Sequence, residues 1–424
     1  MIINQLDLNQ VRGFQRAILN FQPGFNLLVG ENGTGKSTVL WSLRVILSHI
    51  FKTLSFSKEP VINFTEHDIS SDPTQQWPFL SAKLNFNLDV DGLSIPLIYD
   101  VQKNRQNYIE GKAGQPREQV VDTPDVYKFL KSVAIPNSDR FEQQPIAVFY
   151  SAHRSIASEK SVSKRKTIGS KYSAYMEALQ ERELMLGEVA ELWHKEAELN
   201  RTDGFPERAN TAITQALPIF LNGFSNLRVE GDQKRRLFVD KYGVKLDLTQ
   251  ISDGERSLLA ILMDLTRRLS QANPSLQNPA KEAKSIVLID EIDLHLHPRW
   301  QRTIVEKLSE TFPNCQFIAT THSPQIIGEL PQEKIIFLEN GKPPYHPSQA
   351  LGMDSNWVLT NLMHVDDRKT LINNELVEIT QLIKREQYEK ATDKIDALRI
   401  QVKGAFPELV RLQSRIDRIR LLGE

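Results

Sequence analysis

The chain has a single cysteine, Cys315, among its 424 residues. One cysteine forms no internal disulfide and supplies no thiolate zinc cage, so the sequence favours a reducing compartment and predicts a cytoplasmic location. Uninterrupted apolar runs are also short, well below the roughly 20 residues that a membrane helix requires. Polar residues within residues 1–7 interrupt the apolar ones too early for the apolar region of a secretory signal. These absences predict no membrane partner and exclude a transport subunit with its own membrane domain.

An excess of charge of one sign is missing as well. Lys and Arg number 52, and Asp and Glu number 53, which gives a formal net charge of −1. This balance excludes a uniformly basic nucleic-acid coat, so any basic surface must be local. The length suits one large domain or two to three ordinary ones, each with a sizeable core.

The pattern of apolar residues divides the chain into four parts. Strands alternate with a helix in residues 1–151, and strands resume in residues 224–350. Residues 152–223 have helical spacing without a sustained heptad, which predicts a compact helical insert instead of a coiled-coil arm. The spacing of apolar residues in residues 351–424 predicts a helical tail for assembly or partner docking. The alternative is a bundle that caps the domain. In the first part, strands are expected near residues 3–8, 18–21, 25–29, 84–90, 93–97 and 146–150.

A phosphate-binding loop is the most specific motif. Residues 30–37, GENGTGKS, match G-x-x-x-x-G-K-S between an apolar strand and a helix start, a context that a chance glycine-rich turn does not explain. The loop amides and the helix N-terminus suit a phosphate, Lys36 reaches the outer phosphates, and the Ser37 hydroxyl suits Mg²⁺. The residues predicted to bind the nucleotide here are Asn32, Gly33, Thr34, Gly35, Lys36, Ser37 and Thr38.

A second motif, at residues 285–291, supplies carboxylates. Four apolar residues end in Asp290 and Glu291, as expected for a buried parallel strand that delivers acids at its carboxyl end. Asp290 is predicted to hold Mg²⁺ together with Ser37, and Glu291 to deprotonate the attacking water. The alternative is a buried strand that ends in a solvated acidic turn.

The segment at residues 251–259 has two interpretations. Ser252 and Glu255 have the spacing of a capping box before an apolar helix. The same serine, the Gly254 amide and the helix N-terminus also suit a γ-phosphate. The residues alone leave both interpretations open.

This segment resembles the L-S-G-G-Q signature of ABC ATPases, in the S-x-G-E form of SMC-like and OLD-type ATPases. The resemblance implies an α/β fold: an ABC-type P-loop ATPase head with an antiparallel β lobe, a compact helical insert and a C-terminal helical tail. It also implies a homo-oligomer, at least a dimer, in which Ser252, Gly254 and Glu255 of one subunit contact the nucleotide of another.

Further stretches support the resemblance. His322 follows an apolar strand, like the switch histidine that contacts the γ-phosphate in ABC ATPases. Residues 292–298 resemble the E/D-L-H-L-H-P run of OLD-like ATPases, in which we expect His295 and His297 to lie at a subunit interface or cap the next helix, not to bind a transition metal. Arg12 lies in a stretch that resembles N-F-R-G-F, where the arginine approaches the phosphates; a surface turn is the alternative.

Over the whole chain, the motifs are similar to those of the PtuA-type ATPases of Septu anti-phage defence systems. The similarity implies a Mg²⁺-dependent enzyme that hydrolyses ATP to ADP and phosphate and controls a partner nuclease of the HNH type. A glutamine equivalent to that of the Q-loop is not identified. Two alternatives remain: a RecF-like DNA-repair ATPase that clamps duplex DNA, and a nucleotide-gated scaffold with little turnover.

Two basic clusters could contact DNA. The six lysines and arginines in residues 154–171 and the run at 234–236 have the charge to follow a phosphate backbone. Solvated loops have the same composition, so the sequence leaves DNA contact open.

Overall fold

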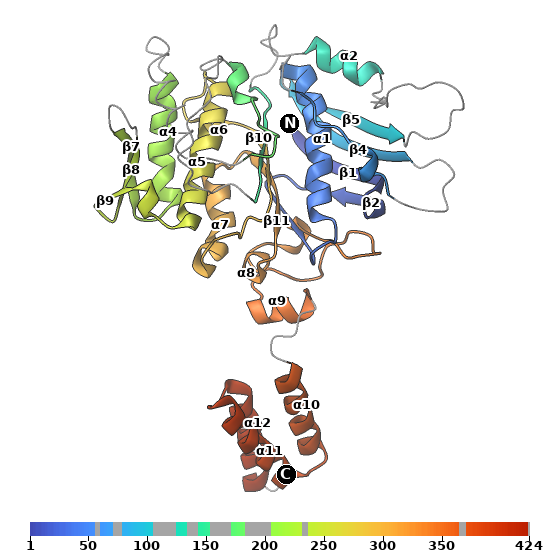
Figure 1. Ribbon diagram of the computed structural model, residues 1–424, viewed down its shortest axis with the longest axis vertical. Coiled ribbons are helices and arrows are strands. Elements are labelled where there is room, and N and C mark those ends of the chain that lie inside the picture. The colour runs from blue at the N-terminus through green and yellow to red at the C-terminus, as the bar shows by residue number, and fades with distance from the viewer. Residues whose placement is uncertain are drawn as a thin grey trace. The chain divides into compact units, whose positions relative to one another are not determined.

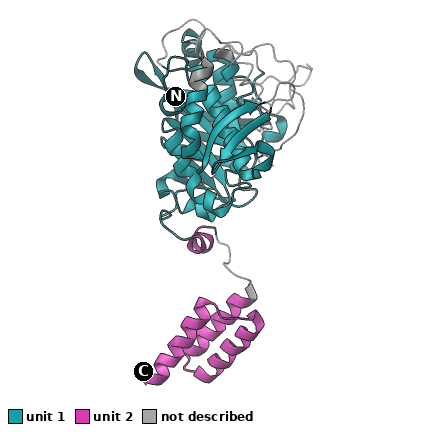
Figure 2. Ribbon diagram, turned by 90° about the vertical axis from the view of Figure 1, so that its left-hand side faces the viewer, with its two compact units in different colours: residues 1–354 teal, residues 355–424 magenta. Residues whose placement is uncertain are grey.

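The computed structural model describes residues 1–55, 60–70, 79–104, 124–133, 143–152, 171–182, 205–230, 236–363 and 370–422. These form two compact units, residues 1–354 and 355–424 (Figure 2). Each unit has its own buried core.

The first unit is built around a five-stranded parallel sheet. Its strands pair in the order β12-β3-β11-β10-β6, and every residue of each strand is buried. A parallel sheet of this kind needs helices on both faces. In Figure 1, α1 (Lys36–Ser55) lies on one side of the sheet, and α5 (Asp253–Ala272) and α7 (Pro298–Thr311) lie on the other. The strands are β3 (Phe25–Val29), β6 (Ala147–Tyr150), β10 (Ser285–Ile289), β11 (Cys315–Thr321) and β12 (Ile335–Phe337).

An antiparallel sheet forms the second layer. Its order is β2-β1-β4-β5, and alternating apolar residues of its strands face the core. The predicted hairpin is confirmed: β4 and β5 are joined by Asp91 and Gly92, which both have positive φ, 52° and 75°, as a tight hairpin turn requires. The predicted α/β head with an antiparallel lobe is therefore confirmed. The strands are β1 (Ile2–Val11), β2 (Phe14–Asn20), β4 (Phe79–Val90) and β5 (Leu93–Asn104).

A small third sheet precedes α5. Its antiparallel strands are β7 (Phe224–Glu230), β8 (Arg236–Lys241) and β9 (Val244–Asp247). The helical insert predicted at residues 152–223 lies in large part outside the described residues, which include α4 (Phe205–Phe220) packed on α5. The compact insert therefore stays a prediction. The remaining elements of this unit are η1 (Glu66–Asp68), α2 (Pro124–Ser132), η3 (Lys171–Ala174), η4 (Leu248–Gln250), α6 (Pro279–Glu282), α8 (Pro324–Ile327) and η5 (Gln332–Lys334).

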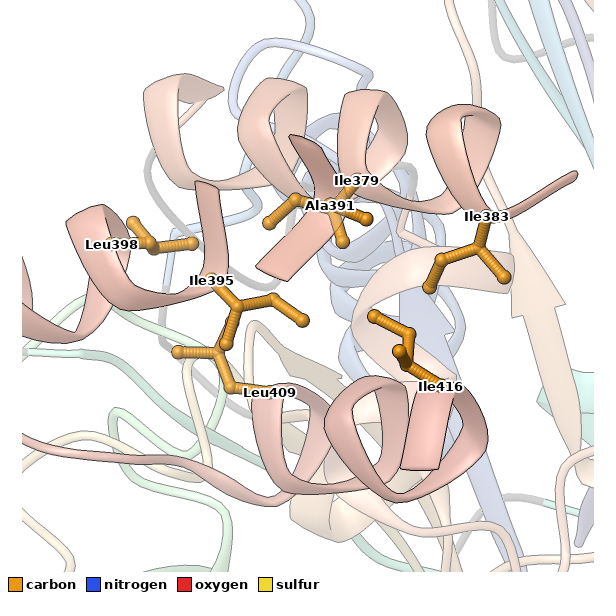
Figure 3. Close-up of a cluster of buried hydrophobic side chains, with 7 residues drawn as sticks. All are labelled: Ile379, Ile383, Ala391, Ile395, Leu398, Leu409 and Ile416. Atoms are coloured by element: carbon orange, nitrogen blue, oxygen red, sulfur yellow. The ribbon is translucent and has the colours of Figure 1, made fainter. Parts of the chain in front are cut away.

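The second unit is helical and begins at Ser355, whereas the sequence pattern placed the tail at residues 351–424. After α9 (Ser355–Asn361), it consists of α10 (Thr370–Lys384), α11 (Tyr388–Val402) and α12 (Pro407–Leu422). Side chains from these last three helices meet in one apolar core (Figure 3). The buried members are Ile379, Ile383, Ala391, Ile395, Leu398, Leu409 and Ile416. None of the helices in the described part of the chain is both long and apolar enough to span a bilayer.

Candidate nucleotide-binding site

The strand order of the parallel sheet brings three distant segments to one edge. β3 pairs with β11 through Val29 and Thr321, and β11 pairs with β10 through Ala319 and Ile289. All three strands run in parallel, so the segments that follow them meet at the carboxyl edge of the sheet. These segments are the glycine-rich loop, the acidic pair and His322.

The glycine-rich loop is closed tightly between β3 and α1. Gly35 has a φ of 102°, and a Cβ there would lie 2.4 Å from the ring of Phe14. A Cβ on Gly30 would lie 2.3 Å from the carbonyl oxygen of Leu338. Residues with a Cβ are therefore excluded at both positions, and glycine is what allows the loop to close this tightly.

Lys36 is buried and bonded to its own loop. Its Nζ donates to the carbonyl oxygens of Gly30 and Glu31, at 2.7 and 2.8 Å. Burial lowers the pKa of Lys36, and the carboxylates of Asp290, Glu291 and Asp293 act against that shift by favouring the ammonium form. The loop lysine and the acids after β10 therefore share one electrostatic environment. A bound phosphate could replace the two carbonyl acceptors.

A threonine hydroxyl fixes the acidic pair. Thr320, buried at the end of β11, donates to Oδ1 of Asp290 at 2.7 Å and accepts from the backbone N–H of Glu291 at 2.7 Å. Both acids remain half-exposed, and Glu291 has a φ of 48°. Sequence reasoning missed Thr320. The available signal was the polar pair at residues 320–321 after three apolar residues, on a strand expected at the same edge.

The segment around His322 is joined to the loop after the acids. Thr321 donates its hydroxyl to Oδ1 of Asp293 at 2.6 Å, and the backbone N–H of His322 donates to the same oxygen at 3.3 Å. The His322 side chain is half-exposed. This places the predicted phosphate sensor at the edge where the phosphate loop begins.

Ser252 begins α5 with a complete capping box, so the structural interpretation of the S-x-x-E spacing is confirmed. Its Oγ accepts from the N–H of Glu255, and the Glu255 carboxylate accepts from the N–H of Ser252, both at 3.3 Å. Ser252 is exposed, whereas Gly254 is buried and a Cβ on it would lie 2.6 Å from the carbonyl oxygen of His295. The Glu255 carboxylate is also held by Lys241 of β8. Ser252 is thus presented outward, while Glu255 is used within its own subunit.

A buried ionic cluster anchors α5 in the first unit. Asp264 is 1% exposed and accepts from Arg268 at 2.9 Å, from Arg182 at 2.8 Å and from the Tyr150 hydroxyl at 3.2 Å. Burial alone would raise the pKa of Asp264, but the surrounding arginines outweigh it and hold that pKa well below its usual range. Because Tyr150 ends β6, the cluster ties the helix of Ser252 to the parallel sheet.

Arg12 lies in the turn between β1 and β2 with a φ of 49°. Its Nε donates to Oδ1 of Asp68 at 2.7 Å, and its guanidinium lies 5.3 Å from the ring centroid of Trp41. The neighbouring Phe14 packs against Gly35, so the turn borders the phosphate loop. Sequence reasoning missed Phe14, an aromatic residue in a strand whose long-range neighbour could not be foreseen. Whether Arg12 reaches a phosphate stays a prediction.

The structure tests the predicted capping role of the histidine pair but not the predicted DNA contact of the basic clusters. His297 caps α7 by accepting from the N–H of Arg299 at 3.2 Å, which confirms the capping interpretation. Residues 154–170, which hold five of the six basic residues of the first cluster, and residues 234–235 lie outside the described part of the chain. Arg236, which is described, lies 3.7 Å from Asp247. DNA contact through these clusters stays a prediction.

The family comparison decides the class of protein. The family model described as "AAA domain, putative AbiEii toxin, Type IV TA system" matches residues 25–328, more than half of the chain. The chain belongs to this AAA family. It is an ATPase that hydrolyses ATP to ADP and phosphate, as the sequence predicted.

Named relatives agree with this assignment. "Retron Ec83 probable ATPase" of Escherichia coli is 29% identical, over 98% of this chain and 86% of the relative. "Septu protein PtuA" of Bacillus thuringiensis is 22% identical, over 80% of this chain and 76% of the relative. The predicted PtuA-type ATPase is therefore confirmed. Among solved structures, the SMC head domain of Thermotoga maritima is 14% identical and covers 82% of this chain and 100% of its own, with a TM-score of 0.42.

Proposed function

We propose that this ATPase binds ATP and Mg²⁺ between two subunits and uses hydrolysis to control a partner nuclease of the HNH type in anti-phage defence. One observation supports the shared site above all others. Lys36 and the Asp290–Thr320–Glu291 group are assembled within one subunit, whereas Ser252 caps a separate helix and faces outward.

The phosphate loop carries the binding step. Lys36 exchanges its bonds to the Gly30 and Glu31 carbonyls for bonds to the outer phosphates, and the backbone amides of residues 32–38 surround them. Thr34 and Thr38 have buried side chains, so they contribute through their amides, as do Asn32, Gly33 and Gly35. Arg12 extends this site from the adjacent turn if a phosphate displaces Asp68 from it.

The residues present fit a magnesium ion. The Ser37 hydroxyl is exposed at the start of α1, and Asp290 is half-exposed and oriented by Thr320. These are the oxygen ligands that Mg²⁺ prefers. Magnesium would supply charge neutralisation between the triphosphate and the three carboxylates near Lys36.

Glu291 is the base and His322 the phosphate sensor in this proposal. Glu291 is half-exposed, and Thr320 holds its backbone, so its carboxylate can take a proton from water at the sheet edge. The backbone of His322 is held at the same edge through Asp293, and we assign the half-exposed His322 side chain to donate to the γ-phosphate.

The neighbouring subunit completes the site with Ser252 and Gly254. The exposed serine and the amides of the first turn of α5 offer donors to the γ-phosphate at a helix N-terminus. Contact of Glu255 with the nucleotide stays a prediction, because Lys241 and Ser252 already engage its carboxylate. We assign it first to holding Ser252.

The defence role is supported by the relatives' names and by the motifs shared with PtuA-type ATPases. "DNA replication and repair protein RecF" of Stenotrophomonas maltophilia matches only 46 residues, 11% of this chain, at 46% identity, and it supports no second candidate function. The test is to purify the chain together with the products of its neighbouring genes and to follow DNA degradation with and without ATP.

Glu291→Gln is the informative variant for this test. The variant should bind ATP but hydrolyse it at least a hundredfold more slowly, in the range expected for loss of a general base. The ATPase should then stay bound to ATP and hold the nuclease in the state that ATP binding sets. Wild-type turnover in this variant would remove Glu291 from the mechanism. A rate of DNA degradation that changes neither with ATP nor with this variant would refute control of a partner nuclease.

A further inference from the structure

The second unit carries two lines of exposed charge with the same spacing. α11 has Glu389, Asp393 and Asp396 at positions i, i+4 and i+7. α12 has Arg411, Arg415 and Arg418 at the same intervals. All six residues are exposed, and the helical period places each set of three along one line. We name these the acidic stripe and the arginine stripe.

Local helix physics does not explain either stripe. Like charges three and four residues apart on one helix repel and reduce its stability. Within the described residues, Asp396 has an ion pair with Arg399 at 3.2 Å, and no ion pair is recorded for the other five. Five of the six charges are thus available to pair with a partner outside the bundle.

We propose that the two stripes are the docking surface for a second copy of this chain. The acidic stripe of one copy lies antiparallel against the arginine stripe of the other, which brings Glu389 to Arg418, Asp393 to Arg415 and Asp396 to Arg411. A two-fold arrangement forms this contact twice, because each copy supplies both stripes. Arginine suits the role, since its planar group binds carboxylates at two points.

An apolar residue continues the acidic stripe. Ile400, which is 79% exposed, lies one turn beyond Asp396 on the same line of α11. Docking against this line buries the Ile400 side chain beside the ion pairs.

Charge complementarity favours a second copy over other occupants. Duplex DNA would bind the arginine stripe, but the acidic stripe would then have no role and would repel the phosphates. An acidic protein partner leaves the acidic stripe unexplained for the same reason. Only a partner with both signs at this spacing satisfies both helices, and the chain itself has that pattern.

This docking goes beyond the shared ATP site and does not rest on it. The stripes lie in residues 355–424, whereas Lys36 and Ser252 belong to residues 1–354. Tail docking therefore persists without nucleotide, while closure of the ATP site requires it.

The experiment measures the mass of the full chain by sedimentation velocity, without nucleotide, in 0.1 M salt. One variant reverses the acidic stripe (E389K, D393K, D396K), one reverses the arginine stripe (R411E, R415E, R418E), and one combines all six changes. Each triple reversal should weaken association on the order of tenfold or more, and the combination should restore it to within about threefold, because opposite charges again face each other. K384E with R385E and K403E is the matched control, since these three exposed residues lie outside the stripes; it should associate as wild type does.

Two further measurements separate weaker association from loss of folding and from charge repulsion. Circular dichroism and thermal unfolding establish that each variant retains its helices, and R411Q with R415Q and R418Q tests loss of charge without repulsion. Unchanged mass in both reversals, or failure of the six-change variant to recover, overturns the proposal. An arginine-stripe variant that associates as wild type does, but no longer binds duplex DNA or an acidic partner protein, would assign the arginine stripe to that partner instead.

Discussion

Lys241 donates to both carboxylate oxygens of Glu255, at 2.9 and 3.1 Å. Glu255 is only 9% exposed, and the same carboxylate closes the capping box on Ser252. The third sheet is therefore bonded directly to the tip of α5. In the shared site that we propose, Lys241 is a positioning residue: it acts on the nucleotide through Glu255 and Ser252.

Lys241→Met should lower kcat roughly tenfold, because a misplaced donor loses transition-state contacts while substrate binding to the phosphate loop survives. Steady-state ATP hydrolysis measures this, with KM expected to change by less than about threefold. The matched control is Lys245→Met on the next strand, β9, whose half-exposed partner Glu230 lies on β7 and not on α5. Equal effects of the two substitutions would show that the sheet matters only for folding.

Thr320→Val should lower kcat by roughly ten- to hundredfold, the range typical of residues that orient a metal ligand or a base. The substitution keeps the shape of the side chain and removes the hydroxyl between Asp290 and Glu291. A rise in the Mg²⁺ concentration needed for half-maximal rate should accompany the loss. The control is Thr311→Val at the end of α7, where the buried hydroxyl has no hydrogen-bond partner among the described residues. That variant should hydrolyse ATP normally.

Asp264→Asn should destabilise the first unit by about 3–5 kcal/mol, because it leaves buried arginines without their counter-charge. Chemical unfolding at pH 7 measures the change. The folded pKa of Asp264 lies well below the ordinary value of 3.8, so its contribution is complete above that pH and is lost as the pH falls through the folded pKa. The difference between the variant and wild type should therefore narrow below pH 4. Asp240→Asn removes a half-exposed carboxylate of the small sheet that pairs with Arg228, and its effect should be small because solvent screens this pair.

Cys315 should resist alkylation in the folded protein. Burial raises the pKa of its thiol to about 12, so almost no thiolate forms at pH 8. Treatment with iodoacetamide, followed by mass spectrometry, should give no adduct in buffer and one adduct in urea. The sign of the shift also predicts that stability falls as the pH rises above 9.0, the ordinary thiol value, because only the unfolded chain then ionises. Rapid labelling of the folded protein would contradict the burial.

The sequence predicted features that depend on neighbours along the chain. The strand-loop-helix around Lys36, the hairpin at Asp91 and Gly92 and the capping box at Ser252 each lie within a few residues, so turn chemistry and periodicity define them.

Contacts between distant segments could not be predicted in this way. Thr320 reaches Asp290 because β10 and β11 are neighbours in the sheet, and Phe14 reaches Gly35 because the antiparallel layer packs beside the loop. Periodicity assigns a residue to a strand face but does not give the order of parallel strands. For the same reason the pairing of Lys241 with Glu255 was not foreseen.

The central claim is that Lys36 of one subunit and Ser252 of another act on the same ATP. Mixing two inactive variants tests it most directly: Lys36→Ala, which loses phosphate binding, and Ser252→Ala, which loses the donor that acts on a neighbour. Each alone should be nearly inactive. Subunits exchanged in equal amounts should recover about one quarter of the wild-type rate, because one site in four combines an intact loop with an intact serine. A mixture no more active than its separate components would contradict the shared site.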